Sequence, residues 1–206
     1  MRRAVGRSAI VGIGVVLLLI GARTSVRGDL PSSPRTPGDV SPLPVIGAVP
    51  DFALRSLEGP GVRLRDLRGK VVVLTFGCSH CTDEPVAVVE GFGRLQQALK
   101  GRGIFGRKGV LVFVVRHPDR ETGTGLRMFA ARIRVDPYGW LILGGSPQVT
   151  EHLRDRFGRL GADGTPGPAD TRGRVFLMDY AGRVRRVYTP ETFRVDAVLA
   201  DMERLL

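Results

Sequence analysis

The chain has 206 residues, of which 43% are hydrophobic, so it suits one domain with a hydrophobic core plus appendages. Its formal net charge of +11 comes mainly from scattered arginines without a recognised nucleic-acid-binding motif. We therefore interpret the charge as a solvated basic face and expect no nucleic-acid partner. Only two cysteines are present, too few to stabilise a domain of this size, so the pair is free to have a function.

The N-terminus has the pattern of an export signal. Three arginines within the first seven residues precede a short apolar stretch at residues 8–22. Because a spanning helix needs ~20 residues, we predict that residues 1–25 form either a cleaved signal peptide or a membrane anchor. Residues 26–48 are rich in Pro, Ser and Gly and are predicted to be a linker. The domain at 49–206 would then lie on the extracytoplasmic side of the cell envelope, or be secreted after cleavage.

The body alternates strand and helix patterns. Alternating segments at residues 51–57 and 62–67 predict an N-terminal β-hairpin, and the apolar runs at 71–76 and 109–115 are typical of strands buried on both faces. This order predicts an α/β fold with a mixed central sheet flanked by helices. The remaining predicted elements are helices at 83–101, 122–134, 146–158 and 189–206, the last capped at Thr189, a strand at 140–145 and a hairpin at 174–188.

Both cysteines lie in "VVVLTFGCSHC", where Cys78 and Cys81 follow a central strand and precede a helix. Open α/β sheets place their sites at this end, and a helix N-terminus lowers a thiol pKa from about 8.5 toward about 7. The spacing and setting favour redox chemistry, with His80 between the two sulfurs. An inert disulfide and a Cys78 that only fills the core are the alternatives. A zinc site would lack a second cysteine pair to complete its ligands.

The body resembles the SCO/SenC family of thioredoxin-fold copper and redox proteins. "VPDFALRSLEGPGVRLRDLRGKVVVLTFGCSHC" is similar to the opening of that family, and "RHPDRETGTGLRMF", "WLILGGSPQVTEHLRDRFG" and "VFLMDYAGRVRRVY" are similar to its later segments, in the same order. The resemblance implies a thioredoxin-like three-layer fold. It also implies thiol–disulfide exchange and/or copper delivery during respiratory cytochrome oxidase assembly, with a protein client in the envelope such as an oxidase subunit.

The same resemblance locates the copper ligands of the family, which are two cysteines in a Cys-x-x-x-Cys motif and a distant histidine. Counted from Phe76, the first cysteine falls on Cys81 and the second on Pro85. Counted back from Asp179, the histidine falls on Thr171. Two of the three ligands are therefore replaced, and copper stays a possible cofactor rather than an implied one.

The resemblance to thioredoxin-like oxidoreductases also places the attacking cysteine at Cys81. Their partner cysteine would stand at Glu84 and their cis-proline at Gly173, so neither relative is matched in full. We interpret Cys81 as the attacking thiolate and Cys78 as its resolving partner. The two would form a disulfide and exchange through a mixed disulfide.

His117 adds a metal-binding alternative. It follows the second buried strand, at the same sheet end as Cys81, where the family has aspartate. With Cys78 and Cys81, and with His80 as an optional fourth ligand, it would form a relocated soft site suited to Cu(I). An incidental loop histidine is the competing interpretation.

Two other functions stay open. One is a non-catalytic thioredoxin-fold module that binds a partner through its basic face. The other is a peroxiredoxin-like peroxidase, favoured by the turn "CTDE" at residues 81–84. Those enzymes need a threonine three residues before the cysteine, and that residue is Cys78 here.

Overall fold

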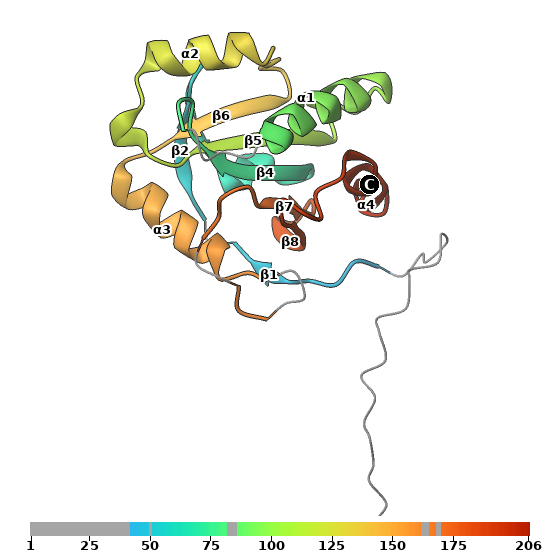
Figure 1. The fold of residues 1–206 in the computed structure, drawn as a ribbon. Helices are drawn as coiled ribbons and strands as arrows, with labels where there is room; N and C mark the ends of the chain where they lie inside the picture. The colour runs from blue at the N-terminus through green and yellow to red at the C-terminus, as the bar shows by residue number, and fades with distance from the viewer. Residues whose placement is uncertain (1–41, 50, 82–85, 162–164, 168–169) are drawn as a thin grey trace, which may run out of the picture. The chain divides into compact units, whose positions relative to one another are not determined.

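The computed structural model describes residues 42–49, 51–81, 86–161, 165–167 and 170–206 (Figure 1). The predicted export signal and most of the predicted linker lie outside these residues. Within the described part, no helix combines the length and the apolar character needed to cross a membrane.

A mixed sheet of eight strands organises the domain, in the order β1-β8-β7-β4-β5-β6-β2-β3. Strands β4, β5 and β6 run parallel, and β7 pairs antiparallel with β4. The N-terminal hairpin of β2 and β3 extends the sheet beyond β6. These pairings confirm the predicted mixed α/β architecture. The strands are β1 (Gly47–Ala48), β2 (Ala53–Ser56), β3 (Gly61–Arg63), β4 (Val71–Gly77), β5 (Gly109–Val115), β6 (Trp140–Gly144), β7 (Val175–Met178) and β8 (Arg183–Tyr188).

Helices cover both faces of this sheet. Since successive side chains of a strand point to opposite faces, Val71 and Val73 of β4 pack with buried residues of α1 and α4, whereas Val72 and Leu74 pack with those of α3. Figure 1 shows α1 and α3 on opposite sides of the sheet. The three layers are therefore those that the sequence predicts. The helices are α1 (Val86–Gly101), α2 (Gly123–Arg132), α3 (Pro147–Gly158) and α4 (Val195–Glu203).

The second strand of the hairpin is shorter than predicted. Strand β3 ends at Arg63, and Leu64–Leu67 forms a 3₁₀ turn instead of more strand. The carboxylate of Asp66 accepts a hydrogen bond from the Arg63 N–H at 2.8 Å, which holds this turn. Leu64 and Leu67 are both buried, because residues three apart lie on one side of a 3₁₀ turn.

The last helix also begins later than predicted, at Val195 rather than at Thr189. The N–H groups of Thr192 and Phe193 both donate to the Thr189 carbonyl, and the Thr189 N–H donates to Thr192 Oγ1 at 2.8 Å. These bonds close an isolated turn that places Phe193 in the core, 7% exposed. The helix can start only after the chain leaves this turn.

The described end of the predicted linker packs on the domain. Strand β1 pairs antiparallel with β8, and Leu43 is only 2% exposed. The guanidinium of Arg185 donates to the carbonyls of Leu43 and Pro44. The folded unit therefore begins before residue 49.

Candidate redox site

The cysteine loop begins where β4 ends. In the parallel pair of β4 and β5, Gly77 is in register with Val115, so the segments that follow the two strands emerge side by side. The Arg116 N–H donates to the Gly77 carbonyl at 2.7 Å and extends this pairing by one step. The two strands are buried along their whole length, which gives the loops at their ends a rigid base.

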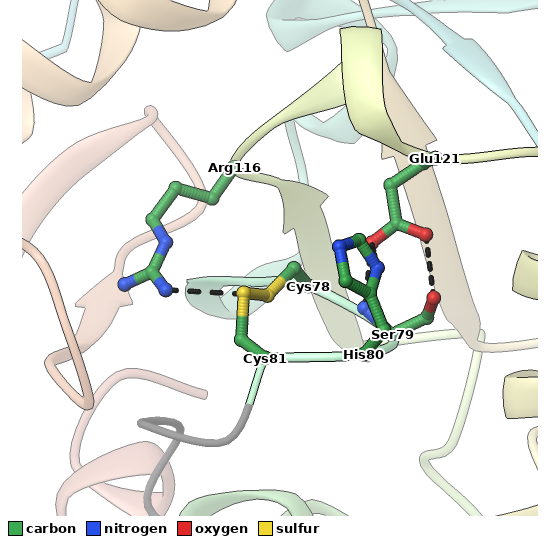
Figure 2. The surroundings of a disulfide bond; sticks show 6 residues. All are labelled: Cys78, Ser79, His80, Cys81, Arg116 and Glu121. Carbon is green, nitrogen blue, oxygen red and sulfur yellow. Dashed lines mark hydrogen bonds and ion pairs between the residues drawn. A yellow bond between two sulfur atoms is a disulfide. The ribbon is translucent and has the colours of Figure 1, made fainter.

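Cys78 and Cys81 are joined by a disulfide bond, with their Cα atoms 5.6 Å apart (Figure 2). The predicted pairing is therefore present. Cys78 is 4% exposed, whereas Cys81 is only partly buried. An incoming thiol from solvent consequently has better access to Cys81 than to Cys78.

A buried carboxylate holds the residues between the two cysteines. Glu121 accepts hydrogen bonds from the Ser79 backbone N–H at 2.6 Å and from Ser79 Oγ at 2.5 Å. Its side chain is 2% exposed, and His80 Nδ1, on a half-exposed ring, lies 3.5 Å from Glu121 Oε1. Sequence reasoning missed Glu121. The available signal was an acidic residue six positions after the second buried strand, at the sheet end that carries the cysteines.

Arg116 contacts the disulfide from another side. Its Nη2 lies 4.0 Å from Cys78 Sγ, and the residue is 6% exposed. Figure 2 shows Arg116 and Glu121 on opposite sides of the cysteine loop. Sequence reasoning missed this residue as well, although an arginine directly after a fully apolar strand is itself a signal.

His117 is the next residue, and it is partly buried. Burial lowers the pKa of His117 below its ordinary value, and the charges of neighbouring arginines, with Arg116 first, lower it further. Across the described residues, no group of three His, Cys, Asp or Glu side chains is arranged to hold a metal ion. The structure therefore does not assemble His117 with the two sulfurs into a ligand set.

The remaining ligand positions of the family also fit copper poorly. The backbones of Arg172 and Phe76 form an isolated parallel β-bridge, so the segment that carries Thr171 lies beside the end of β4. Thr171 is 2% exposed. A threonine hydroxyl is a poor ligand for Cu(I), which prefers sulfur and imidazole. Glu84 and Pro85 lie outside the described residues, and a proline side chain has no ligand atom. The residues present therefore do not fit the copper site of the family.

The fold and the site together define the class. A mixed sheet covered by helices on both faces, with a Cys-x-x-Cys disulfide at the carboxyl end of a central strand, is a thioredoxin-like fold. The chain belongs to the SCO1/SenC family, whose sequence model matches residues 46–206. A search of curated protein sequences returned no significant match.

Solved structures of Sco proteins have the same fold. A SCO1/SenC family lipoprotein from Bacillus anthracis str. Ames is 22% identical with a TM-score of 0.66, over 80% of this chain and 97% of that chain. BsSco, described as a Sco-family cytochrome c oxidase assembly protein with a disulfide switch, is 20% identical with a TM-score of 0.64, over 80% and 95%. Bradyrhizobium japonicum ScoI, solved with copper bound, is 22% identical with a TM-score of 0.60, over 77% and 99%.

Proposed function

We propose that this protein carries out thiol–disulfide exchange on a protein client in the cell envelope, during the assembly of respiratory cytochrome oxidase. The observation that carries the proposal is the Cys78–Cys81 disulfide at the end of β4, with Cys78 buried and Cys81 partly exposed. Membership of the SCO1/SenC family supports the assembly role. So does the disulfide switch that is named for BsSco.

The exposure of the two residues supports the roles that we propose for them. A client thiolate attacks Cys81 Sγ, the Cys78–Cys81 bond breaks, and its electron pair leaves on Cys78 as a thiolate. A second client thiolate then attacks the client sulfur of the mixed disulfide and releases Cys81. The client is oxidised by two electrons, and the Cys78–Cys81 pair is reduced. In the reverse direction Cys81 attacks a client disulfide and Cys78 resolves the mixed disulfide.

The cellular setting of the proposal rests on the sequence. Arginines before the apolar stretch at 8–22 support an N-terminus that is held in or cleaved at a membrane, with the domain outside the cytoplasm. An oxidising envelope is also the compartment in which a disulfide persists.

Copper delivery has less support, because Pro85 and Thr171 replace two ligands and His117 belongs to no ligand set among the residues that the structure describes. A copper titration of the full-length protein, with Cys81→Ser and His117→Ala as variants, tests it. One tightly bound Cu(I) per chain that either variant abolishes would establish the relocated site and contradict our preference.

The exchange itself is tested with the full-length protein and a dithiol peptide. We expect the wild type to oxidise the peptide with matching loss of its own disulfide. With a disulfide peptide, the Cys78→Ser variant should accumulate a mixed disulfide on Cys81, because the resolving thiol is missing, whereas Cys81→Ser should not. A wild type that exchanges no faster than the double serine variant would contradict the proposal. A double serine variant that still supports oxidase assembly in cells would identify a non-catalytic module.

A further inference from the structure

We propose that Arg116 stabilises the thiolate of Cys78 when the disulfide opens, and so makes the Cys78–Cys81 pair a stronger oxidant. The inference rests on the proposed exchange and adds to it a residue that sets the direction of electron transfer. It arises from a charged side chain at the buried sulfur, which neither the fold nor the cysteine spacing requires.

The backbone of Arg116 is fixed at the end of β5, and its guanidinium lies beside the Cys78 sulfur. Its backbone N–H is bonded to the Gly77 carbonyl at 2.7 Å, one residue before Cys78, so the two residues share one edge of the sheet. Its guanidinium Nη2 lies 4.0 Å from Cys78 Sγ, and both residues are less than 10% exposed, at 6% and 4%. A guanidinium keeps its proton at any physiological pH. A permanent positive charge therefore lies at the buried sulfur, where solvent screens it weakly.

The charged groups around the cysteine loop include a carboxylate, Asp170, that interacts electrostatically with Arg116. Glu121 and His80 lie on the Ser79 side of the loop, opposite Arg116 (Figure 2). The Glu121 carboxylate accepts hydrogen bonds from the N–H and the Oγ of Ser79. On the Arg116 side is Asp170, which pairs with Arg172 at 2.6 Å. Burial opposes ionisation of Asp170, but its hydrogen bonds from Arg172 and the charges of Arg172 and Arg116 outweigh burial and lower its pKa.

The course of the exchange step determines which sulfur interacts with the positive charge of Arg116. When a client thiolate bonds to Cys81, the electron pair of the broken bond goes to Cys78, next to the guanidinium. An opposite charge within ~4–6 Å favours the ionised form of a group and lowers an acid pKa by roughly 1–3. A thiol of lower pKa leaves faster, and its reduced form is more stable relative to the disulfide. Arg116 should therefore favour reduction of this pair and oxidation of the client.

The test compares Arg116→Met, which removes the charge with little loss of volume, with Arg116→Lys, which keeps a charge. Arg120→Met, at an exposed position, is the control for net charge. Reduction potentials are measured across a range of pH in glutathione buffers on the full-length protein. For Arg116→Met we expect a ~10-fold smaller equilibrium constant for oxidising a dithiol, which is about 30 mV for a two-electron couple. The pH at which the slope of potential against pH changes should rise.

Arg116→Lys should recover part of the effect, and Arg120→Met should match the wild type. If Arg116 had a purely structural role, Arg116→Met would change stability but not the pH at which the slope of the reduction potential changes. A folded Arg116→Met protein in which this pH is unchanged therefore overturns the inference. If Arg116→Met does not fold, the Cys81→Ser protein decides the question. There the Cys78 pKa should lie below about 8.5, and an ordinary or raised value overturns the inference. If the wild-type protein shows no thiol–disulfide exchange, the proposed function itself is wrong. If the wild type exchanges but Arg116→Met has the same reduction potential and pH profile, only the role of Arg116 is wrong.

Discussion

The contact between Ser79 and Glu121 should make a measurable contribution to the stability of the cysteine loop. We consider Glu121→Gln and Ser79→Ala, singly and together. The carboxylate accepts two hydrogen bonds from Ser79, and it does so at a side chain that is 2% exposed. His80, with a side chain 52% exposed, adds little, because exposed ion pairs are weak.

The magnitude follows from the chemistry of each change. Hydrogen bonds to a charged group contribute about 1.5–3 kcal/mol each. Glutamine keeps one oxygen for the Ser79 N–H but places an amide opposite Ser79 Oγ, so we expect Glu121→Gln to lower the free energy of unfolding by ~1.5 kcal/mol. Ser79→Ala removes only the hydroxyl bond to the charged carboxylate and should cost ~1.5 kcal/mol. The double variant should fall short of the sum by ~1 kcal/mol, because both changes remove the same bond.

Urea unfolding of the oxidised full-length protein measures all four free energies. Glu151→Gln, an exposed change on α3, is the matched control and should stay within about 0.5 kcal/mol of the wild type. Strict additivity of the two changes at the cysteine loop would refute the reasoning, since it would mean that Ser79 and Glu121 do not interact in solution.

Three further predictions concern other residues. Asp179→Asn should lower the free energy of unfolding by ~3 kcal/mol, because the buried carboxylate accepts bonds from two arginine side chains and two backbone N–H groups. Burial opposes ionisation of Asp179, but these bonds outweigh it and lower its pKa. The stabilisation by Asp179 is therefore fully present above its unfolded-state pKa of about 4 and is lost as the pH falls through its folded-state pKa. If Asp179→Asn lowers the free energy of urea unfolding as much at low pH as at neutral pH, this explanation is wrong. Gly91→Ala should cost ~2 kcal/mol in thermal or urea unfolding, since its Cβ would lie 2.3 Å from Phe193 Cε1, and an unchanged midpoint would argue against that packing. His117→Ala should leave the exchange rate with a dithiol peptide within about twofold of wild type, because the described structure holds the histidine outside any ligand set; a large loss would restore the metal-site alternative.

Strong local signals in the sequence predicted much of the fold. The apolar runs identified β4 and β5 because strands buried on both faces need no polar alternation. The helix predicted at 146–158 is α3, and Ser146 caps it by accepting a hydrogen bond at Oγ from the Val149 N–H. The predicted hairpin at 174–188 is present, and its turn contains Gly182 with a φ of +80°, which favours glycine.

The errors came from patterns that fit two structures. Leu64 and Leu67 are spaced for a 3₁₀ turn, but the surrounding alternation also suits a strand. Thr189 has the residue type of a helix cap, yet the packing of Phe193 delays the helix to Val195. Burial in the core, of Leu64 and Leu67 in one case and of Phe193 in the other, accompanies the observed alternative, and residue spacing alone does not show which side chains are buried.

The cysteine pair was predictable from spacing, but the residues that contact it were not. Arg116 and Glu121 reach the loop only because β4 and β5 are parallel and in register at Gly77 and Val115. A sequence gives the end of each strand, but not their relative register or the direction of the side chains beyond them. The electrostatic part of the site therefore required the structure.

The most direct test of the account is to identify which sulfur first bonds to an external thiol. Oxidised wild-type protein is mixed with reduced glutathione, quenched early with an alkylating agent and mapped by peptide mass spectrometry. We expect glutathione on Cys81 and the alkyl group on Cys78, because Cys81 is the more exposed of the bonded pair. Glutathione found mainly on Cys78, or a disulfide that resists glutathione altogether, would contradict the account.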